Sequence, residues 1–218
     1  MRIIDCIQGT EEWKKARLGV PTASQFDKII TPAGKPSKSA ETYLYQLAAE
    51  YILQQPYDMT TSEFMQRGTA LEAEARRFYE FQKDIDVQEV GFCLTDDGLA
   101  GCSPDGLIGD DGGLEIKCLS AGRHIAHLLK MSADDYKVQI QGSLYVTGRD
   151  WWDQLAYNPA MPSPIIRCHR DEPFIALLDE YLKRFLNQLE GCIARLATMG
   201  IKQVTEEIDE ELEELFPA

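Results

Sequence analysis

Hydrophobic periodicity changes from helical to alternating near residue 87, and this change limits the folds open to the chain. Before it, apolar residues recur at helical spacing from Ser39 to Pro56 and from Ser62 to about Gln82. After it, short runs separated by turns rich in Asp and Gly predict strands over 87–95, 99–103 and 114–119. We interpret these three strands as one meander.

The other elements complete a mixed α/β layer architecture. Thr10 is a predicted N-cap for a helix through Arg17, and a second helix is expected from Pro21 to about Ile30, before a polar loop over 31–39. Later elements are expected as a helix over 134–146, strands over 151–157 and 165–170, and a helix over 173–199. We therefore expect one domain over 1–218, with a central mixed β-sheet flanked by helices.

The formal net charge of -14 argues at first sight against a nucleic-acid partner, because phosphate binding depends on Lys and Arg. The charges are unevenly distributed, however. Residues 1–40 carry seven basic groups against four acids, a local net of +3, whereas residues 205–218 carry seven acids and no base. Acids gathered in a tail leave room for a positive surface elsewhere. We interpret the tail as a solvated terminal helix, and its alternative is a segment that binds a partner or another subunit. Net charge therefore does not exclude DNA.

The sequence has no run of the roughly 18 apolar residues that a membrane span needs. Residues 1–6 lack the apolar core of a secretory signal. The six cysteines are scattered without a CxxC pair, which favours reduced thiols. We therefore expect a cytoplasmic protein that has no membrane partner.

The stretch from Gly101 to Cys118 carries the clearest chemical signal. If its acidic turn centres on residues 111–112, Asp105 lies nearly opposite Lys117, and Glu115 shares a strand face with Lys117. Two carboxylates and an ammonium then converge, and the carbonyl of Ile116 offers a further oxygen. Such a set suits Mg²⁺ binding and phosphodiester cleavage.

The alternative interpretation of this stretch is an ordinary Pro-Asp-Gly turn beside a solvent-facing ion pair. Against it, Leu114, Ile116 and Cys118 occupy the alternate, core-type positions, so Glu115 and Lys117 lie on a defined face. Glu72, on the helix expected after Ser62, is a candidate fourth acid. Its alternative is a solvated helix charge.

Four ordered stretches, at 12–24, 67–75, 102–118 and 136–141, resemble the successive motifs of the lambda-exonuclease and YqaJ-like phage recombinase nucleases. The resemblance runs from about residue 10 to about residue 185. It implies a restriction-endonuclease-like PD-(D/E)xK core and a 5′-to-3′ exonuclease that uses two Mg²⁺ ions, for which Mn²⁺ substitutes. Such an enzyme degrades the 5′-phosphorylated strand of linear double-stranded DNA to mononucleotides and leaves 3′ tails for recombination by single-strand annealing.

The resemblance also implies roles for individual residues. Asp105, Glu115 and the Ile116 carbonyl bind metal, Glu72 binds or orients it, and Lys117 positions or activates the attacking water. Gln139 matches the family's active-site glutamine. Gln141 stays open as the alternative, because with Tyr145 it fits the Q-x-x-x-Y pattern of related nucleases.

A pocket for the terminal 5′-phosphate is implied at Arg17, Ser24 and Ser103, whose forked cation and compact hydroxyls suit a phosphate. From the residues alone, Arg17 is a surface cation and Ser24 a helix cap. Met65 falls where the family places an apolar wedge that separates the strands, and its alternative is a core methionine. The family's basic loop residue has no clear single match in this sequence, and Lys35 and Lys38 are the two candidates for it.

Double-stranded DNA ends, a homotrimeric ring and a single-strand annealing protein are the partners that the resemblance implies, in a bacterial host cell or from a prophage. Three rival functions remain. One is a same-fold endonuclease or single-strand nuclease, and another is a non-catalytic module that binds DNA ends or a protein partner. The third is an acidic mimic of DNA. We interpret Trp13, Trp151 and Trp152, together with His124, His127 and His169, as structural.

Overall fold

The structure is a computed structural model that describes residues 1–57 and 63–204, and it describes side chains over 1–57 and 71–204. The elements follow in this order: β1 (Arg2–Ile4), α1 (Glu11–Arg17), η1 (Ala23–Lys28), α2 (Ala40–Leu53), α3 (Glu63–Lys83), β2 (Phe92–Leu94), β3 (Gly101–Cys102), β4 (Gly106–Ile108), β5 (Gly112–Cys118), α4 (Ala121–Lys130), η2 (Asp134–Tyr136), α5 (Lys137–Thr147), β6 (Trp151–Tyr157), β7 (Ile165–His169) and α6 (Glu172–Thr198). The mixed α/β class is confirmed.

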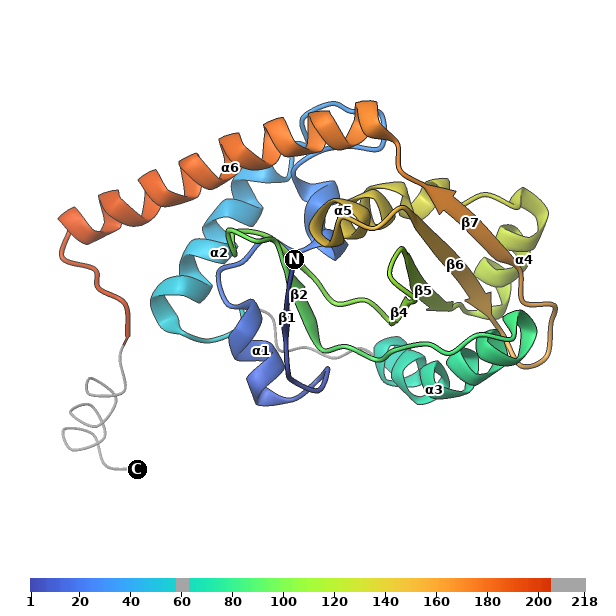
Figure 1. The fold of residues 1–218 in the computed structure, drawn as a ribbon. Coiled ribbons are helices and arrows are strands. Elements are labelled where there is room, and N and C mark those ends of the chain that lie inside the picture. Colours follow the sequence, from blue (N-terminus) through green and yellow to red (C-terminus); the bar gives the residue numbers. More distant parts are fainter. Residues whose placement is uncertain (58–62, 205–218) are drawn as a thin grey trace.

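The strands form two sheets rather than one central sheet (Figure 1). The first has the order β1-β2-β3 and is antiparallel. The second has the order β4-β5-β6-β7, in which only the β5 and β6 pair is parallel. The two sheets come close where Gln88, just before β2, exchanges hydrogen bonds of 2.8 Å in both directions with Leu107 of β4.

The predicted three-strand meander is therefore wrong. Strands β2 and β3 pair with each other, but β2 also pairs with β1 at the start of the chain, and β5 belongs to the other sheet. Strands of two or three residues make few local contacts, so their partners are chosen by packing that the local sequence does not show.

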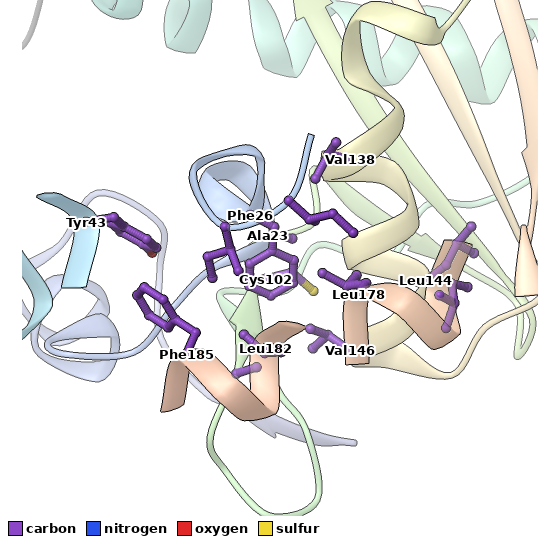
Figure 2. Packing of buried hydrophobic residues seen from close by; sticks show 14 of the residues in the cluster. Ala23, Phe26, Tyr43, Cys102, Val138, Leu144, Val146, Leu178, Leu182 and Phe185 are labelled. Carbon is purple, nitrogen blue, oxygen red and sulfur yellow. The ribbon is translucent and has the colours of Figure 1, made fainter. Parts of the chain in front are cut away.

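Helices cover the sheets through two clusters of buried apolar side chains. The larger cluster joins η1, α2, α5 and α6 to the first sheet and to Leu107 and Trp152 of the second. Figure 2 shows part of it, from Tyr43 and Phe185 to Leu144. The rings of Tyr43 and Phe185 stack with their centroids 5.6 Å apart. Helix α5 approaches η1 so closely that a Cβ on Gly142 would lie 2.6 Å from the Phe26 ring. The smaller cluster packs α3 against β4, β5 and β6.

Other predicted elements are confirmed or shifted. The predicted strand over 151–157 is β6, and Thr10 caps α1 by accepting a hydrogen bond from the backbone N–H of Trp13 at 3.4 Å. The helix expected over 21–30 is a 3₁₀ helix, η1, and Gly68 does not interrupt α3. The expected cap at Ser62 and the acidic tail over 205–218 lie outside the described residues. Within the described part, no helix is long and apolar enough to cross a membrane.

Helix α4 corresponds to no predicted element, because polar residues lie on its buried face and apolar residues on its exposed face. His124 and His127 are buried, while Ile125 and Leu129 have 49% and 82% of their surface exposed. The Nε2 atom of His124 lies 2.8 Å from the carbonyl of Pro162. These two histidines belong to no metal-binding group among the residues that the structure describes.

Candidate active site

The centre of the site is the hairpin formed by β4 and β5. Gly106 pairs with Leu114, and Ile108 with Gly112, so the connecting turn is residues 109–111. Gly109 there has a φ of +50°, a left-handed conformation that glycine adopts without steric cost. The turn is thus centred on residue 110, one to two residues earlier than the expected centre at 111–112, and the register places Asp105 opposite Glu115 rather than opposite Lys117. The carboxylate of Asp105 accepts a hydrogen bond of 2.5 Å from the N–H of Ile116.

Arg149 holds the turn of this hairpin from inside the protein. Its buried guanidinium donates to the carbonyls of Ile108, Gly109 and Gly112 at 3.1, 2.8 and 2.7 Å. One nitrogen of a charged side chain thus contacts three carbonyls of the turn, and hydrogen bonds from an ionised donor are stronger than those between neutral groups. Arg149 follows α5 and directly precedes the Asp150 linker to β6, and no sequence motif pointed to it.

Glu115, Lys117 and Gln139 form a closed network of side chains. The ammonium of Lys117 lies 2.6 Å from Oε1 of Glu115, which is only 3% exposed. The amide of Gln139, on α5, donates to the same Glu115 oxygen at 2.6 Å, and its own oxygen accepts from Lys117 at 3.1 Å. The Tyr136 ring centroid is 5.0 Å from the Lys117 ammonium. Each of the three side chains fixes the other two.

The structure places Gln139 in this network and Gln141 outside it. The amide of Gln141 donates to the carbonyl of His169 at 2.8 Å, and its oxygen accepts from the N–H of Asp171 at 2.8 Å. Tyr145 donates to Asp179 at 2.9 Å. Gln141 and Tyr145 therefore tie α5 to β7 and α6.

Glu72 reaches the same region from α3. Its Oε1 accepts a hydrogen bond of 3.2 Å from Arg76, one helical turn later. Arg76 also donates to the main-chain carbonyl of Asp105 at 3.0 Å. The sequence offered one signal for this contact, the i,i+4 spacing of an acid and an arginine.

The carboxylates of Asp105 and Glu72 are crowded and poorly hydrated, and the pKa values of these two groups reflect this. Burial raises the pKa of Asp105 well above its ordinary value, and the charges of Glu115 and Glu72 raise it further. Burial also raises the pKa of Glu72, against the lowering effect of Arg76. Burial alone lowers the pKa of Lys117, but Glu115 and Asp105 outweigh it, and the net shift is upward. A cation placed here relieves repulsion among the acids.

The donor set fits a hard cation that keeps part of its water shell. Asp105, directly before β4, and Glu115, in β5, offer carboxylate oxygens, and the Ile116 carbonyl is a third oxygen from the same hairpin. Among the residues that the structure describes, no three Asp, Glu, His or Cys side chains already form a metal-binding group. Glu72 is instead paired with Arg76. One or two carboxylates with several waters is the usual way in which proteins bind Mg²⁺.

A second cluster lies where α1 meets the loop after β3. Arg17 donates to the hydroxyl of Ser103 at 3.4 Å, and the indole N–H of Trp13 donates to the same hydroxyl at 2.9 Å. The Arg17 guanidinium stacks 4.1 Å from the Trp13 ring centroid. Trp13 therefore belongs to this cluster, and its i,i+4 spacing to Arg17 was the signal available in the sequence.

The third predicted member, Ser24, is exposed at the start of η1. Its hydroxyl lies 3.4 Å from that of Thr22, which forms a bridge with Gly101 just before Ser103. Lys35 and Lys38 are both exposed in the loop between η1 and α2, so exposure does not choose between them. The side chain of Met65 lies outside the described residues.

The site combines a crowded pair of carboxylates with a lysine at the β4 and β5 hairpin of a mixed α/β fold. Comparison with known proteins identifies the class of protein to which such a chain belongs. Residues 12–150 match the model of the YqaJ-like viral recombinase domain, and the chain belongs to this family. No curated protein sequence matched the chain.

Solved structures place the chain among relatives of phage-type alkaline exonucleases. The alkaline exonuclease LHK-Exo from Laribacter hongkongensis is 32% identical with a TM-score of 0.80, and the match covers 88% of this chain and 98% of that one. A structure of LHK-Exo in complex with dAMP is 33% identical over the same shares, also with a TM-score of 0.80. A phage-related exonuclease from Haemophilus somnus 129PT is 15% identical with a TM-score of 0.64, over 81% of this chain and 96% of that one, and shares the fold.

Proposed function

We propose that this protein is a Mg²⁺-dependent 5′-to-3′ exonuclease. It degrades the 5′-phosphorylated strand of linear double-stranded DNA to mononucleotides and leaves 3′ tails for phage-type recombination by single-strand annealing. The observation that carries the proposal is the convergence of Asp105, Glu115 and Lys117 on the β4 and β5 hairpin of a chain homologous to alkaline exonucleases. The core then corresponds to the PD-(D/E)xK type.

In this proposal, Asp105, Glu115 and the Ile116 carbonyl hold Mg²⁺, and Glu72 completes or orients the metal set. The bound ions polarise the scissile phosphate and lower the pKa of water. Lys117 orients the attacking water and offsets negative charge on the phosphate. Gln139 fixes the positions of the Glu115 carboxylate and the Lys117 ammonium relative to each other through its two hydrogen bonds. Mn²⁺ supports the same chemistry, because it accepts similar oxygen ligands.

The direction of digestion follows from the cluster of Arg17, Trp13 and Ser103, which we assign to the terminal 5′-phosphate. Trp13 uses the acceptor capacity of the Ser103 hydroxyl, so the hydroxyl proton is free to point to a phosphate oxygen. Arg17 adds a permanent positive charge that is partly desolvated. Ser24 is the proposed third contact.

The first test is digestion of linear duplex DNA with each strand labelled in turn, carrying either a 5′-phosphate or a 5′-hydroxyl. We expect mononucleotides from the 5′-phosphorylated strand only, no digestion in EDTA, and slower digestion from a 5′-hydroxyl end. Arg17→Ala should lose about tenfold in kcat/KM on phosphorylated ends, because a charge-assisted contact contributes about 1.5 kcal/mol. It should lose little on hydroxyl ends.

Lys15→Ala is the matched control, because Lys15 is an exposed cation on the same helix. Cleavage within closed circular DNA, or preference for single strands, would favour a same-fold endonuclease or single-strand nuclease. DNA binding without any Mg²⁺-dependent cleavage would favour a non-catalytic binding module, and binding to DNA-binding proteins alone a mimic.

Mg²⁺ affinity should increase with pH. Because burial, Glu115 and Glu72 raise the pKa of Asp105, the metal-free carboxyl keeps its proton to higher pH than usual. Mg²⁺ must displace that proton, so binding releases protons and strengthens until pH exceeds the raised pKa. Calorimetry of Mg²⁺ binding in buffers with different ionisation enthalpies measures the release. Affinity that is constant from pH 5 to pH 9 would contradict the expectation.

The proposal extends to the assembly. A homotrimeric ring that encloses DNA, a single-strand annealing protein as partner, and action in the cytoplasm of a bacterial host are the context in which such an enzyme works. Met65 is the proposed strand-separating wedge. Lys35 or Lys38 is the residue proposed to contact the DNA backbone. Sedimentation of the purified protein tests the trimer directly.

A further inference from the structure

Arg76 uses all three of its guanidinium nitrogens on different partners. Nε donates to the main-chain carbonyl of Asp105 at 3.0 Å, and NH2 donates to Glu72 at 3.2 Å. NH1 forms an ion pair of 2.8 Å with Glu89. The Arg76 side chain is 12% exposed, whereas that of Glu89 is 73% exposed. The two contacts inside the site are therefore the better protected ones.

These contacts join parts of the chain that no strand pairing joins. Helix α3 carries Glu72 and Arg76, while Asp105 lies between β3 and β4. The three side chains together line a cavity of about 570 Å³, whose other walls include residues 3–8 at the start of the chain. The smaller apolar cluster packs α3 against the strands further along the helix, while beside the cavity Arg76 joins Glu72 to the main chain of Asp105.

We propose that Arg76 is a positioning residue. It sets the distance between the Glu72 carboxylate and the main chain of Asp105, so that both acids can contact the same metal ion. This positioning role rests on the proposed function only for the identity of the metal, Mg²⁺. Arg76 holds one acid by its side chain and the other by its backbone. Arg76 therefore holds Asp105 without contacting its carboxylate, one oxygen of which accepts the N–H of Ile116.

A purely electrostatic role and a positioning role of Arg76 predict opposite changes in Mg²⁺ affinity when Arg76 is replaced. As a cation beside a cation site, Arg76 repels Mg²⁺, so removal of its charge alone strengthens metal binding. As a positioning residue, its removal weakens metal binding, because partners that orient metal ligands typically contribute 10-fold to 100-fold in affinity. The direction of the change therefore distinguishes the two roles.

Lysine separates the roles further. The R76K substitution keeps the positive charge and much of the alkyl stem, but it replaces the planar fork by one nitrogen, which cannot bridge Glu72 and the Asp105 carbonyl in the same way. Arg77 is the matched control. It is exposed on the same helix, and its Nε donates to the carbonyl of Ala73, away from the acids.

The experiment measures Mg²⁺ binding to the free protein by calorimetry, with DNA digestion as a second readout. We expect R76K and R76Q each to weaken Mg²⁺ affinity by about tenfold or more, and R77Q to leave it within about twofold of wild type. In a double-mutant cycle, R76Q should weaken binding less in an E72Q background than in wild type, because part of its effect passes through Glu72.

Wild-type affinity in R76K, or tighter binding in R76Q, would overturn the positioning role. Equal losses from R76Q in both backgrounds would remove Glu72 from it. If R76Q fails to fold, R76K carries the test, because it retains charge and stem. Since binding is measured without DNA, an absence of cleavage in wild type would refute the proposed exonuclease and leave this result intact.

Discussion

Replacing Glu115 with glutamine is expected to reduce DNA cleavage by about 10³-fold or more, equivalent to about 4 kcal/mol in the activation barrier. The side chain keeps its shape in this variant. In the wild type, one Glu115 carboxylate oxygen accepts hydrogen bonds from Gln139 and Lys117, and the amide oxygen of the glutamine can accept both. The negative charge that attracts Mg²⁺ is lost. Stability and activity should therefore separate in this variant.

Single-turnover digestion of end-labelled DNA at saturating Mg²⁺ measures the effect, with thermal unfolding as the check on folding. Asp110→Asn is the control, because Asp110 is an exposed acid in the turn of the same hairpin. It should cleave DNA at close to the wild-type rate. Cleavage by the Glu115→Gln variant within tenfold of wild type would move the metal site away from this hairpin.

Replacing Asp153 with alanine is expected to destabilise the protein by about 3 kcal/mol, since removing one partner of a buried ion pair leaves the others unsatisfied. Asp153 is fully buried in β6. It accepts hydrogen bonds of 2.8 and 2.9 Å from Arg167 and one of 2.7 Å from the hydroxyl of Tyr79. Arg167 is 43% exposed and regains water in the variant, which keeps the loss at the lower end of the range for buried pairs.

Tyr79→Phe is the matched control for Asp153→Ala, because it removes one hydrogen bond and leaves the ion pair. It should cost about 1 kcal/mol. Urea unfolding of both variants measures the difference in unfolding free energy. Equal losses would show that the tyrosine hydroxyl, rather than the ion pair with Arg167, accounts for the stability. Tyr79 lies on the same helix as Glu72, so both variants should also weaken digestion through α3.

The sequence was informative where local pattern and local packing agree. Strand β6 was predicted with its observed bounds, because its apolar and aromatic run is bounded on one side by Arg149 and Asp150 and on the other by Asn158 and Pro159. Glu115 and Lys117 were expected on one face from strand alternation alone, and their ion pair lies there. The choice between Gln139 and Gln141 was not local, and only the hydrogen bonds of each separate them.

Distant contacts explain what the sequence did not show. The hairpin register depends on a three-residue turn held by Arg149, which lies about 40 residues further along the chain. Strand β2 pairs with β1, whose residues 2–4 carried no strand signal of their own. Helix α4 was missed because its buried face carries two histidines, so its hydrophobic pattern gave the opposite indication.

The contacts of Arg149 also hold the backbone of the hairpin turn in a way that does not depend on the side chains of the turn. Arg149 reaches only main-chain carbonyls there, while Asp110 and Asp111 point their side chains to solvent. The tip of the hairpin is thus a place where a dye can be attached through an introduced cysteine, a few residues from Asp105 and Glu115. Fluorescence from that position would test whether the proposed DNA substrate approaches the hairpin, while the carboxylates stay in place.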